Sequence, residues 1–273
     1  MQCAAATRHR TAFTLIEMAA VLILIALIAG AIVVGAHLVQ IAEIRQTIAQ
    51  YKSFTAAVYT FRNRYAGLPA DLRFDQAEAL GFPTGDGTFG SGNGDGLISN
   101  ACPEDDAYRF RVLGREGYGF WIHLSQAGLI GYRPRITGWF TLCNVTSYYS
   151  PPSRVLPPAA LGAQFNWAVY EDGVNNHFLL SSFDLFSPSF PLRHLIPPAT
   201  ARVIDTKIDD GAPMTGIVAA VTIPAVSHDL RTPPVPLPPA AGVCVTTETG
   251  TPYNTSSSTY QSTPSCSLRF RME

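Results

Sequence analysis

A single carboxylate, Glu17, stands inside a long apolar run that extends from Thr11 to Leu38. The run contains no lysine or arginine, so no basic side chain within it can neutralise this acid. A charge near the edge of a bilayer is costly unless a partner balances it. Glu17 therefore either reaches back to the polar surface and supports the helix N-terminus electrostatically, or pairs with a positive group from outside the run.

The five cysteines are divided by the same run: Cys3 precedes it, and Cys102, Cys143, Cys244 and Cys266 follow it. If the run crosses a membrane, Cys3 lies in a reducing compartment and the other four lie in an oxidising one. Four cysteines allow three pairings, and the simplest joins sequence neighbours, Cys102 with Cys143 and Cys244 with Cys266. Buried free thiols are the alternative.

A glycine-rich segment that contains Asp86, Asn93 and Asp95 places oxygen side chains close to glycines, as calcium-binding loops do. The match is incomplete, because Cys102 stands where such a loop has its last acidic ligand. The alternative is a surface turn in which Gly and Asn adopt left-handed backbone angles. Calcium is thus a candidate ligand of this loop, and no other cofactor is expected.

The run that holds Glu17 is long enough to span a bilayer. Residues 18–36 carry no charge and would extend ~28 Å as a helix. Arg8 and Arg10 precede the run, which predicts a cytoplasmic N-terminus and an extracytoplasmic remainder. A secretory signal peptide is the competing interpretation, but helical periodicity continues beyond the run without Gly or Pro until Gly67.

Beyond the run, apolar residues recur at steps of three and four, which is the pattern of an amphipathic helix. The predicted seam consists of Ile41, Ile44, Ile48, Tyr51, Thr55, Val58 and Tyr65, widened by Phe54 and Phe61. One helix over residues 13–65 would be about 80 Å long, membrane-spanning over about 13–38 and amphipathic over 39–65. We expect the amphipathic half to pack on a globular head formed by residues 66–273.

The stretch Ala12-Phe13-Thr14-Leu15-Ile16-Glu17 follows a short basic leader and opens an unbroken apolar helix. This arrangement resembles the N-terminus of type IV pilins and type II secretion pseudopilins. The resemblance implies that a prepilin peptidase removes residues 1–12, cuts between Ala12 and Phe13, and methylates the amine of Phe13. It also implies that Glu17 pairs with the Phe13 amine of a neighbouring subunit during assembly. Ala12 departs from the family, which usually has Gly there, so processing is expected to be tolerated or slower.

The head is predicted to be α+β. Gly67-Leu68-Pro69 ends the long helix, a short helix follows, and another helix ends near Gly128 with Trp121, Leu124 and Leu129 toward a core. Strand-like runs predict an antiparallel sheet with a hairpin turn at residues 172–176; they occupy residues 136–145, 165–172, 175–183 and 216–223.

The rest of the head contains fewer apolar residues. A short helix feeds a turn at residues 209–211, and the glycine-rich segment after Leu68-Pro69-Ala70-Asp71 resembles a loop of pseudopilin-like proteins. Residues 231–240 are proline-rich and are expected to form a stiff, extended connector. A disulfide between Cys244 and Cys266 would close a Ser/Thr-rich C-terminal loop.

Composition and motifs narrow the functional classes. Charged residues make up 14% of the chain and the net charge is −1, so no nucleic-acid partner is indicated. The histidines and cysteines lack zinc spacing, and no nucleophile elbow, phosphate loop or dinucleotide fingerprint occurs, so an enzyme is not expected. We interpret His123 as a packed or surface histidine.

We therefore expect a structural pilin-like subunit of a type IV pilus or a secretion pseudopilus. The size of the head favours a minor subunit. The resemblance implies a single-pass protein of the bacterial inner membrane with a periplasmic head, extracellular once assembled in a pilus. Its expected partners are other pilin-like subunits, the prepilin peptidase, the inner-membrane assembly machinery and the lipid bilayer. The alternative is an anchored single-span binding protein that never polymerises.

Overall fold

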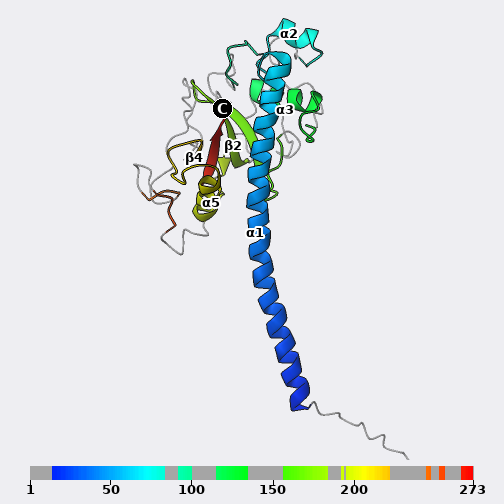
Figure 1. Ribbon diagram of the computed structural model, residues 1–273, viewed down its shortest axis with the longest axis vertical. Coiled ribbons are helices and arrows are strands. Elements are labelled where there is room, and N and C mark those ends of the chain that lie inside the picture. Colours follow the sequence, from blue (N-terminus) through cyan, green and yellow to red (C-terminus); the bar gives the residue numbers. More distant parts are fainter. Residues whose placement is uncertain are drawn as a thin grey trace, which may run out of the picture. The chain divides into compact units, whose positions relative to one another are not determined.

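The computed structural model describes residues 14–83, 92–99, 115–134, 156–183, 192–193, 195–221, 244–246, 252–255 and 266–272. Its contacts divide the chain into two compact units, Met1–Ala42 and Glu43–Glu273. Helix α1, Leu15–Tyr65, contributes to both units (Figure 1). The predicted long N-terminal helix is thus confirmed.

The first unit contains the apolar half of α1. Among the described residues, α1 is the one helix long and apolar enough to cross a bilayer, and its most apolar stretch is not buried within the chain. Its large side chains point outward all around the helix; Leu15 is 92% exposed and Ile16 is 77% exposed. By length and composition, this half of α1 fits a membrane anchor.

The second half of α1 buries one face, as the periodicity predicts. Ile44, Ile48, Tyr51 and Val58 belong to the core. The centre of the buried stripe differs from the predicted seam, because Phe54 and Phe61 are buried whereas Thr55 and Tyr65 are only half-buried. A straight α-helix has 3.6 residues per turn, so a seam of steps of three and four drifts around it and the larger aromatic rings take the centre.

The head contains a five-stranded antiparallel sheet (Figure 1). The strand order is β1-β2-β5-β4, and β3 pairs with β2. The strands are β1 Phe165–Glu171, β2 Asn176–Phe183, β3 Leu192–Arg193, β4 Val218–Val221 and β5 Ser267–Arg271. The predicted strands at 165–172, 175–183 and 216–223 are confirmed as β1, β2 and β4, whereas the strand predicted at 136–145 lies outside the described residues.

Strand β5 was not predicted, although it lies between β2 and β4. Its residues Leu268 and Phe270 are fully buried, and they alternate with Ser267, Arg269 and Arg271. The register pairs Phe270 with Phe178 of β2 and with Val218 of β4. A short strand with two arginines has little hydrophobic signal of its own, and its place in the sheet depends on neighbours that are distant in sequence.

Aromatic side chains join α1 to the sheet. The Tyr51 ring lies 5.0 Å from that of Phe270, and the Phe54 ring lies 5.9 Å from that of Trp167. Trp167 in turn packs 5.1 Å from Phe270, so α1, β1 and β5 meet at this cluster. Large aromatic rings bury much apolar area per residue, so this cluster supplies much of the packing between α1 and the strands.

The side chain of Gln50 adds hydrogen bonds to the contact between α1 and the strands. Its amide nitrogen donates to the carbonyl of Pro158 at 3.1 Å. Its amide oxygen accepts the backbone N–H of Ala160 at 2.8 Å and the indole N–H of Trp167 at 3.2 Å. Gln50 therefore fixes both the rotation of α1 and the segment that enters β1.

In the part of the head that the structure describes, the shorter helices are α2 Phe74–Ala79, α3 Arg115–Gln126 and α5 Pro198–Ile208. Trp121 and Leu124 of α3 are fully buried, and Leu129 packs partly buried against the core, as predicted. The end of α1 differs in detail from the prediction. The left-handed residue there is Ala66, with φ of 57°, and Gly67 follows it.

Cys244 and Cys266 form a disulfide, as the pairing of sequence neighbours predicts. Cys266 also forms an isolated bridge with Ile196 and immediately precedes β5, so the disulfide attaches residues 244–246 to the sheet. Cys102 and Cys143 lie outside the described residues, as do the leader 1–12 and the connector 231–240.

His123 is a packed histidine, the first of its two predicted interpretations. Its Nδ1 accepts the backbone N–H of Ala70 at 3.0 Å, and its Nε2 lies 3.3 Å from the carbonyl oxygen of Pro83. The imidazole stacks on Phe82 at 4.7 Å and on Phe61 at 6.2 Å. These contacts assign the neutral tautomer with the proton on Nε2, and burial lowers the pKa of His123 to about 4.

We expect His123→Phe to remove a pH-dependent part of the stability. An unfolded histidine takes up a proton near its ordinary pKa of 6.5, and folded His123 does so only near 4, so the unfolded state binds more protons between these values. The stability advantage of the wild type over the variant should therefore be full above pH 6.5. It should shrink by roughly 3 kcal/mol as the pH falls to 4.

Denaturant unfolding of the full chain in detergent, followed by tryptophan fluorescence, measures this difference. His123→Gln serves as a control, because it retains a donor and an acceptor without titrating. The carboxylates that titrate in the same range are common to all three proteins and cancel in the comparison. A stability difference that stays constant from pH 7 to pH 4 would contradict the assignment.

Candidate functional site

The side chain of Glu17 caps the start of α1. Its Oε2 accepts the backbone N–H of Thr14 at 2.8 Å and the hydroxyl of Thr14 at 3.0 Å. In return, the backbone N–H of Glu17 donates to Thr14 Oγ1 at 3.3 Å. Thr14 and Glu17 thus form a capping box, which satisfies donors that the first turn of a helix leaves without partners.

The sequence contained the signal for this box, because Thr-x-x-Glu before an apolar run is its usual pattern. The electrostatic alternative for Glu17, support of the helix N-terminus, therefore has a definite geometry. Ala12 and Phe13 lie outside the described residues. The predicted pairing of Glu17 with the amine of a neighbouring Phe13 involves a second chain and stays a prediction.

The surface that surrounds Glu17 is apolar. Between Leu15 and Val39, the large hydrophobic side chains that the structure describes are 48–92% exposed. Removing such side chains from water is worth roughly 1.5–3 kcal/mol each, so this surface requires a cover of lipid or protein. Glu17 is the one acid within it.

The glycine-rich loop of the head closes on a buried carboxylate, that of Asp71. Asp71 Oδ1 accepts the backbone N–H of Gly94 at 2.9 Å, and its Oδ2 accepts that of Gly96 at 2.8 Å. Burial raises the pKa of Asp71, and the negative charge of Asp95 adds to this effect, whereas the two N–H groups oppose it. The sequence alone does not indicate this role for Asp71, although the Leu-Pro-x-Asp segment precedes the loop.

Two glycines are required for this closure. A Cβ at position 92 would lie 2.2 Å from the Cα of Asp71, so only glycine allows the backbone to approach. Gly94 has a φ of 75°, in the left-handed region that other residues rarely adopt. The loop is therefore shaped by its backbone around Asp71.

Asn93 and Asp95 of the predicted calcium set mainly contact each other. Asn93 Nδ2 donates to Asp95 Oδ2 at 2.6 Å, and Asn93 Oδ1 accepts the Asp95 N–H at 3.0 Å. Asp95 Oδ1 accepts the N–H of Leu97. These bonds are those of a surface turn, the alternative interpretation of the loop. Asp86 lies outside the described residues, so calcium at this loop stays a prediction.

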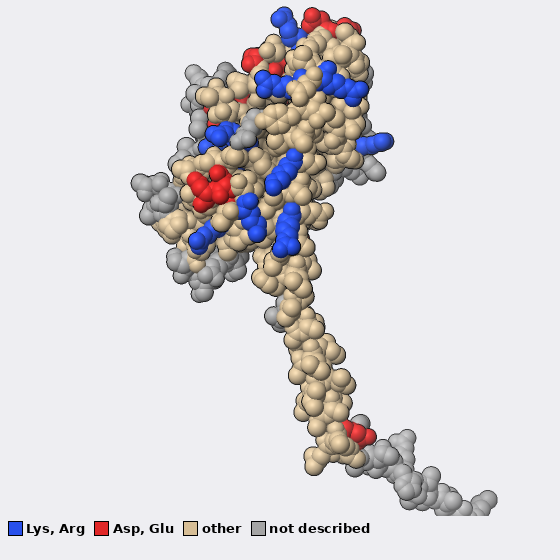
Figure 2. Space-filling model, viewed as in Figure 1, with Lys and Arg blue, Asp and Glu red and all other residues tan. Residues whose placement is uncertain are grey.

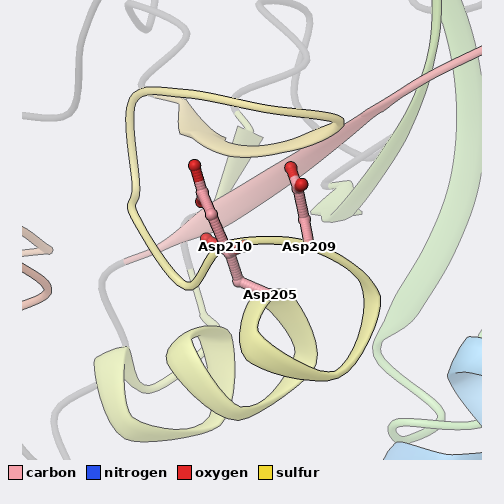
Figure 3. Close-up of side chains that lie close together, drawn as sticks. All are labelled: Asp205, Asp209 and Asp210. Carbon is pink, nitrogen blue, oxygen red and sulfur yellow. The ribbon is translucent and has the colours of Figure 1, made fainter.

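A second acidic group, which the sequence did not single out as a site, comprises Asp205 of α5 with Asp209 and Asp210 of the following turn (Figure 3). One carboxylate oxygen of each lies within 4.8 Å of the others. Carboxylates so close together are of the type that binds hard cations. Each of them also holds its own turn together through hydrogen bonds.

Asp209 accepts the N–H groups of Ile217 and Val218. Asp210 accepts the N–H of Ala212 at 2.8 Å and the hydroxyl of Thr215 at 2.6 Å. The Asp209 bonds join the turn to the start of β4, and the Asp210 bonds lie within the turn, so both carboxylates are fixed in place. The cluster therefore has a structural role in closing the turn after α5.

Asp205 is fully buried and joins this turn to the disulfide-linked segment. Its Oδ2 accepts the hydroxyl of Tyr253 at 2.8 Å, and its Oδ1 accepts the N–H of Gly211 at 3.0 Å. Burial raises the pKa of Asp205 to about 6, and the Tyr253 bond opposes that rise. The carboxylate thus anchors residues 252–255 on α5.

The turn between β1 and β2 carries a His–Asp–Arg group. His177 Nε2 lies 2.8 Å from Asp172 Oδ2, and Arg269 Nη1 lies 3.5 Å from the same oxygen. Asp172 Oδ1 accepts the N–H of Asn175 at 2.8 Å, which closes the predicted hairpin turn. Burial lowers the pKa of His177, and the hydrogen bond to Asp172 opposes this shift. The group fixes the hairpin to β5.

We expect Asp71→Asn to loosen the glycine-rich loop without unfolding the head. The amide would present an NH2 group to one of the two backbone donors, and an unpaired buried donor costs about 1–3 kcal/mol. Amide hydrogen exchange at Gly94 and Gly96 should then be faster by roughly tenfold or more. Asp75→Asn on the exposed face of α2 is the matched control. Unchanged exchange at both glycines would show that Asp71 does not hold the loop.

No family model, no curated protein and no solved structure matches the chain.

Proposed function

We propose that the chain is a structural pilin-like subunit that assembles through α1 into a type IV pilus or a secretion pseudopilus, as a minor component. The observation that carries the proposal is the placement of Glu17. It is the one acid on an apolar helical surface that the chain itself leaves uncovered. Its position directly after Phe13-Thr14-Leu15-Ile16 supports the prepilin resemblance.

An uncovered apolar helix has two suitable environments, the bilayer and a bundle of like helices. In a bundle of low dielectric, a lone carboxylate is strongly penalised, and a positive group opposite it stabilises one axial register. Cleavage after Ala12 would create such a group, the amine of Phe13. The two charged groups that pair in this way, the Phe13 amine and the Glu17 carboxylate, both lie at the start of the mature chain.

The capping box is compatible with this sequence of events. It uses the N–H and hydroxyl of Thr14, and cleavage between Ala12 and Phe13 removes neither. Before assembly, the Glu17 carboxylate would thus have hydrogen-bond partners within its own chain. On entering a filament it would gain a positively charged partner. The free subunit then keeps its first-turn donors satisfied by Glu17 while it resides in the membrane.

The second candidate function is the anchored protein that never polymerises. The capping box favours it, because a Glu17 that is satisfied within its own chain needs no partner. Both candidates have a membrane-spanning α1 and a head outside the cytoplasm. They differ in whether the leader is removed and in whether the protein needs the charge of Glu17 to assemble with other subunits.

Mass spectrometry of the protein purified from bacterial membranes that contain a prepilin peptidase tests processing. We expect loss of residues 1–12 and one added methyl group on Phe13. Ala12→Gly, which restores the usual family residue, should give equal or faster cleavage. A wild-type chain that keeps its leader, while the Ala12→Gly variant loses it, would assign the anchored alternative to the natural sequence.

Glu17→Gln separates capping from charge pairing. Glutamine can still accept the Thr14 hydrogen bonds of a capping box, but it carries no charge. We expect normal membrane insertion and at least a roughly tenfold loss of incorporation into filaments, the size of a lost charge pair. Thr14→Ala, which removes the hydroxyl and keeps the charge, should incorporate far better. Equal incorporation of Glu17→Gln and wild type would reject the charge-pairing role.

A further inference from the structure

The half of α1 that belongs to the head is basic. From Glu43 to Tyr65 it carries four basic residues, Arg45, Lys52, Arg62 and Arg64, against one acid, Glu43. All four side chains are exposed. In Figure 2, basic side chains lie over α1 along the head.

One face of this half forms a regular exposed seam, opposite the buried stripe. Its members are spaced by alternating steps of four and three, so they share one side of the helix. This outer seam consists of Arg45, Ala49, Lys52, Ala56, Tyr59 and Asn63, all of them exposed. Tyr59 is 41% exposed beside the small Ala56, and an exposed tyrosine is a residue type that often anchors protein contacts.

Among the described residues, the charges of the outer seam form no ion pair with an acid of their own chain. Among the residues that the structure describes, the ion pairs are those of Asp172 with His177 and Arg269. Arg45 and Lys52 take part in neither. A helix face that combines unpaired cations with an exposed tyrosine has the composition of a contact surface for an acidic partner.

A complementary acidic surface is present in the same compact unit. Figure 2 shows an acidic patch over the α5 region of the head. Asp210 is exposed and Asp209 is half-buried there. Bonds to their own turn hold both carboxylates in fixed positions, which lowers the entropy lost when they meet a partner.

We infer that the outer seam of α1 is a docking surface for a second copy of this chain, whose Asp209–Asp210 turn faces Lys52. The inference rests on the proposed function, since a filament supplies the second copy. The two surfaces are different parts of one head, so the contact is head-to-tail and repeats from copy to copy. This contact would determine how neighbouring heads pack, in addition to the contacts that the apolar part of α1 makes.

A lipid surface fits the seam less well. Lys52 lies ~21 Å and Asn63 ~38 Å along α1 beyond Leu38, the end of the apolar run. The headgroup layer is only about 5–8 Å thick on each side of the hydrocarbon. Lipid headgroups would therefore not extend along the seam.

The chain's lysine content allows a direct test, because Lys52 and Lys207 are its two lysines. A carbodiimide activates a carboxylate, the lysine amine displaces the resulting urea, and an amide forms with net loss of water to the reagent. The full-length mature protein is assembled from an equal mixture of 14N and 15N subunits, treated with carbodiimide and digested. We expect light–heavy peptides that join Lys52 to Asp209 or Asp210.

Charge reversal provides a second readout. Lys52→Glu and Asp210→Lys should each lower the polymerised fraction roughly two- to fivefold, the range for an exposed ion pair. The double variant should recover at least half of the loss. Arg133→Glu and Asp75→Lys reverse exposed charges outside the outer seam and the Asp209–Asp210 turn. They are the matched controls and should assemble like wild type.

Polymers that form normally but yield no light–heavy Lys52 peptide, or a double variant that recovers nothing, overturn the docking surface while the proposed function stands. Binding of duplex DNA that Lys52→Glu abolishes, without those peptides, would assign the seam to nucleic acid instead and overturn the inference. A wild-type chain that remains single overturns the proposed function, and the inference falls with it.

Discussion

The structure depends on one constraint, that a single helix must bury apolar surface in two different ways. The first half of α1 is apolar on every side and lies bare of protein. The second half is apolar on one side, where Phe54 and Phe61 pack against the aromatic residues of the head. No break separates the halves, since α1 is continuous from Leu15 to Tyr65.

Each half requires its own kind of polar compensation. At the start of α1, Thr14 and Glu17 form hydrogen bonds with each other on an otherwise apolar helix. In the head, Gln50 and His123 bind backbone groups of the loops that cover the helix. Buried carboxylates do the same for the loops themselves, with Asp71 closing the glycine-rich loop and Asp205 holding Tyr253. Polar side chains thus determine where irregular segments lie, and aromatic rings determine where regular elements pack.

The parts of the fold that could be predicted are those with local, periodic signals. The long helix, α3, the β1–β2 hairpin and the Cys244–Cys266 pair all follow from spacing or turn residues. Strand β5 could not be predicted in this way, because Leu268 and Phe270 are its only apolar positions before Met272 and their partners in β2 and β4 are distant in sequence.

The candidate site shows a similar division. Glu17 was predictable as an important residue, because an acid in an apolar run is conspicuous, and its Thr-x-x-Glu pattern could also have indicated the capping box. Asp71 and Asp205 could not be assigned in advance, since their partners Gly94, Gly96 and Tyr253 are brought close by the fold alone. Asp86, Cys102 and Cys143 lie outside the described residues.

In the proposed assembly, the charge of Glu17 meets the amine of another subunit. The most direct measurement is a solid-state NMR distance in assembled protein, prepared from subunits labelled with 15N at the Phe13 amine mixed with subunits labelled with 13C at the Glu17 carboxyl. We expect an intermolecular dipolar coupling that corresponds to roughly 4 Å, the separation of an ion pair. A polymer without any such coupling, in which the Glu17 carboxyl remains close only to Thr14 of its own chain, would contradict it.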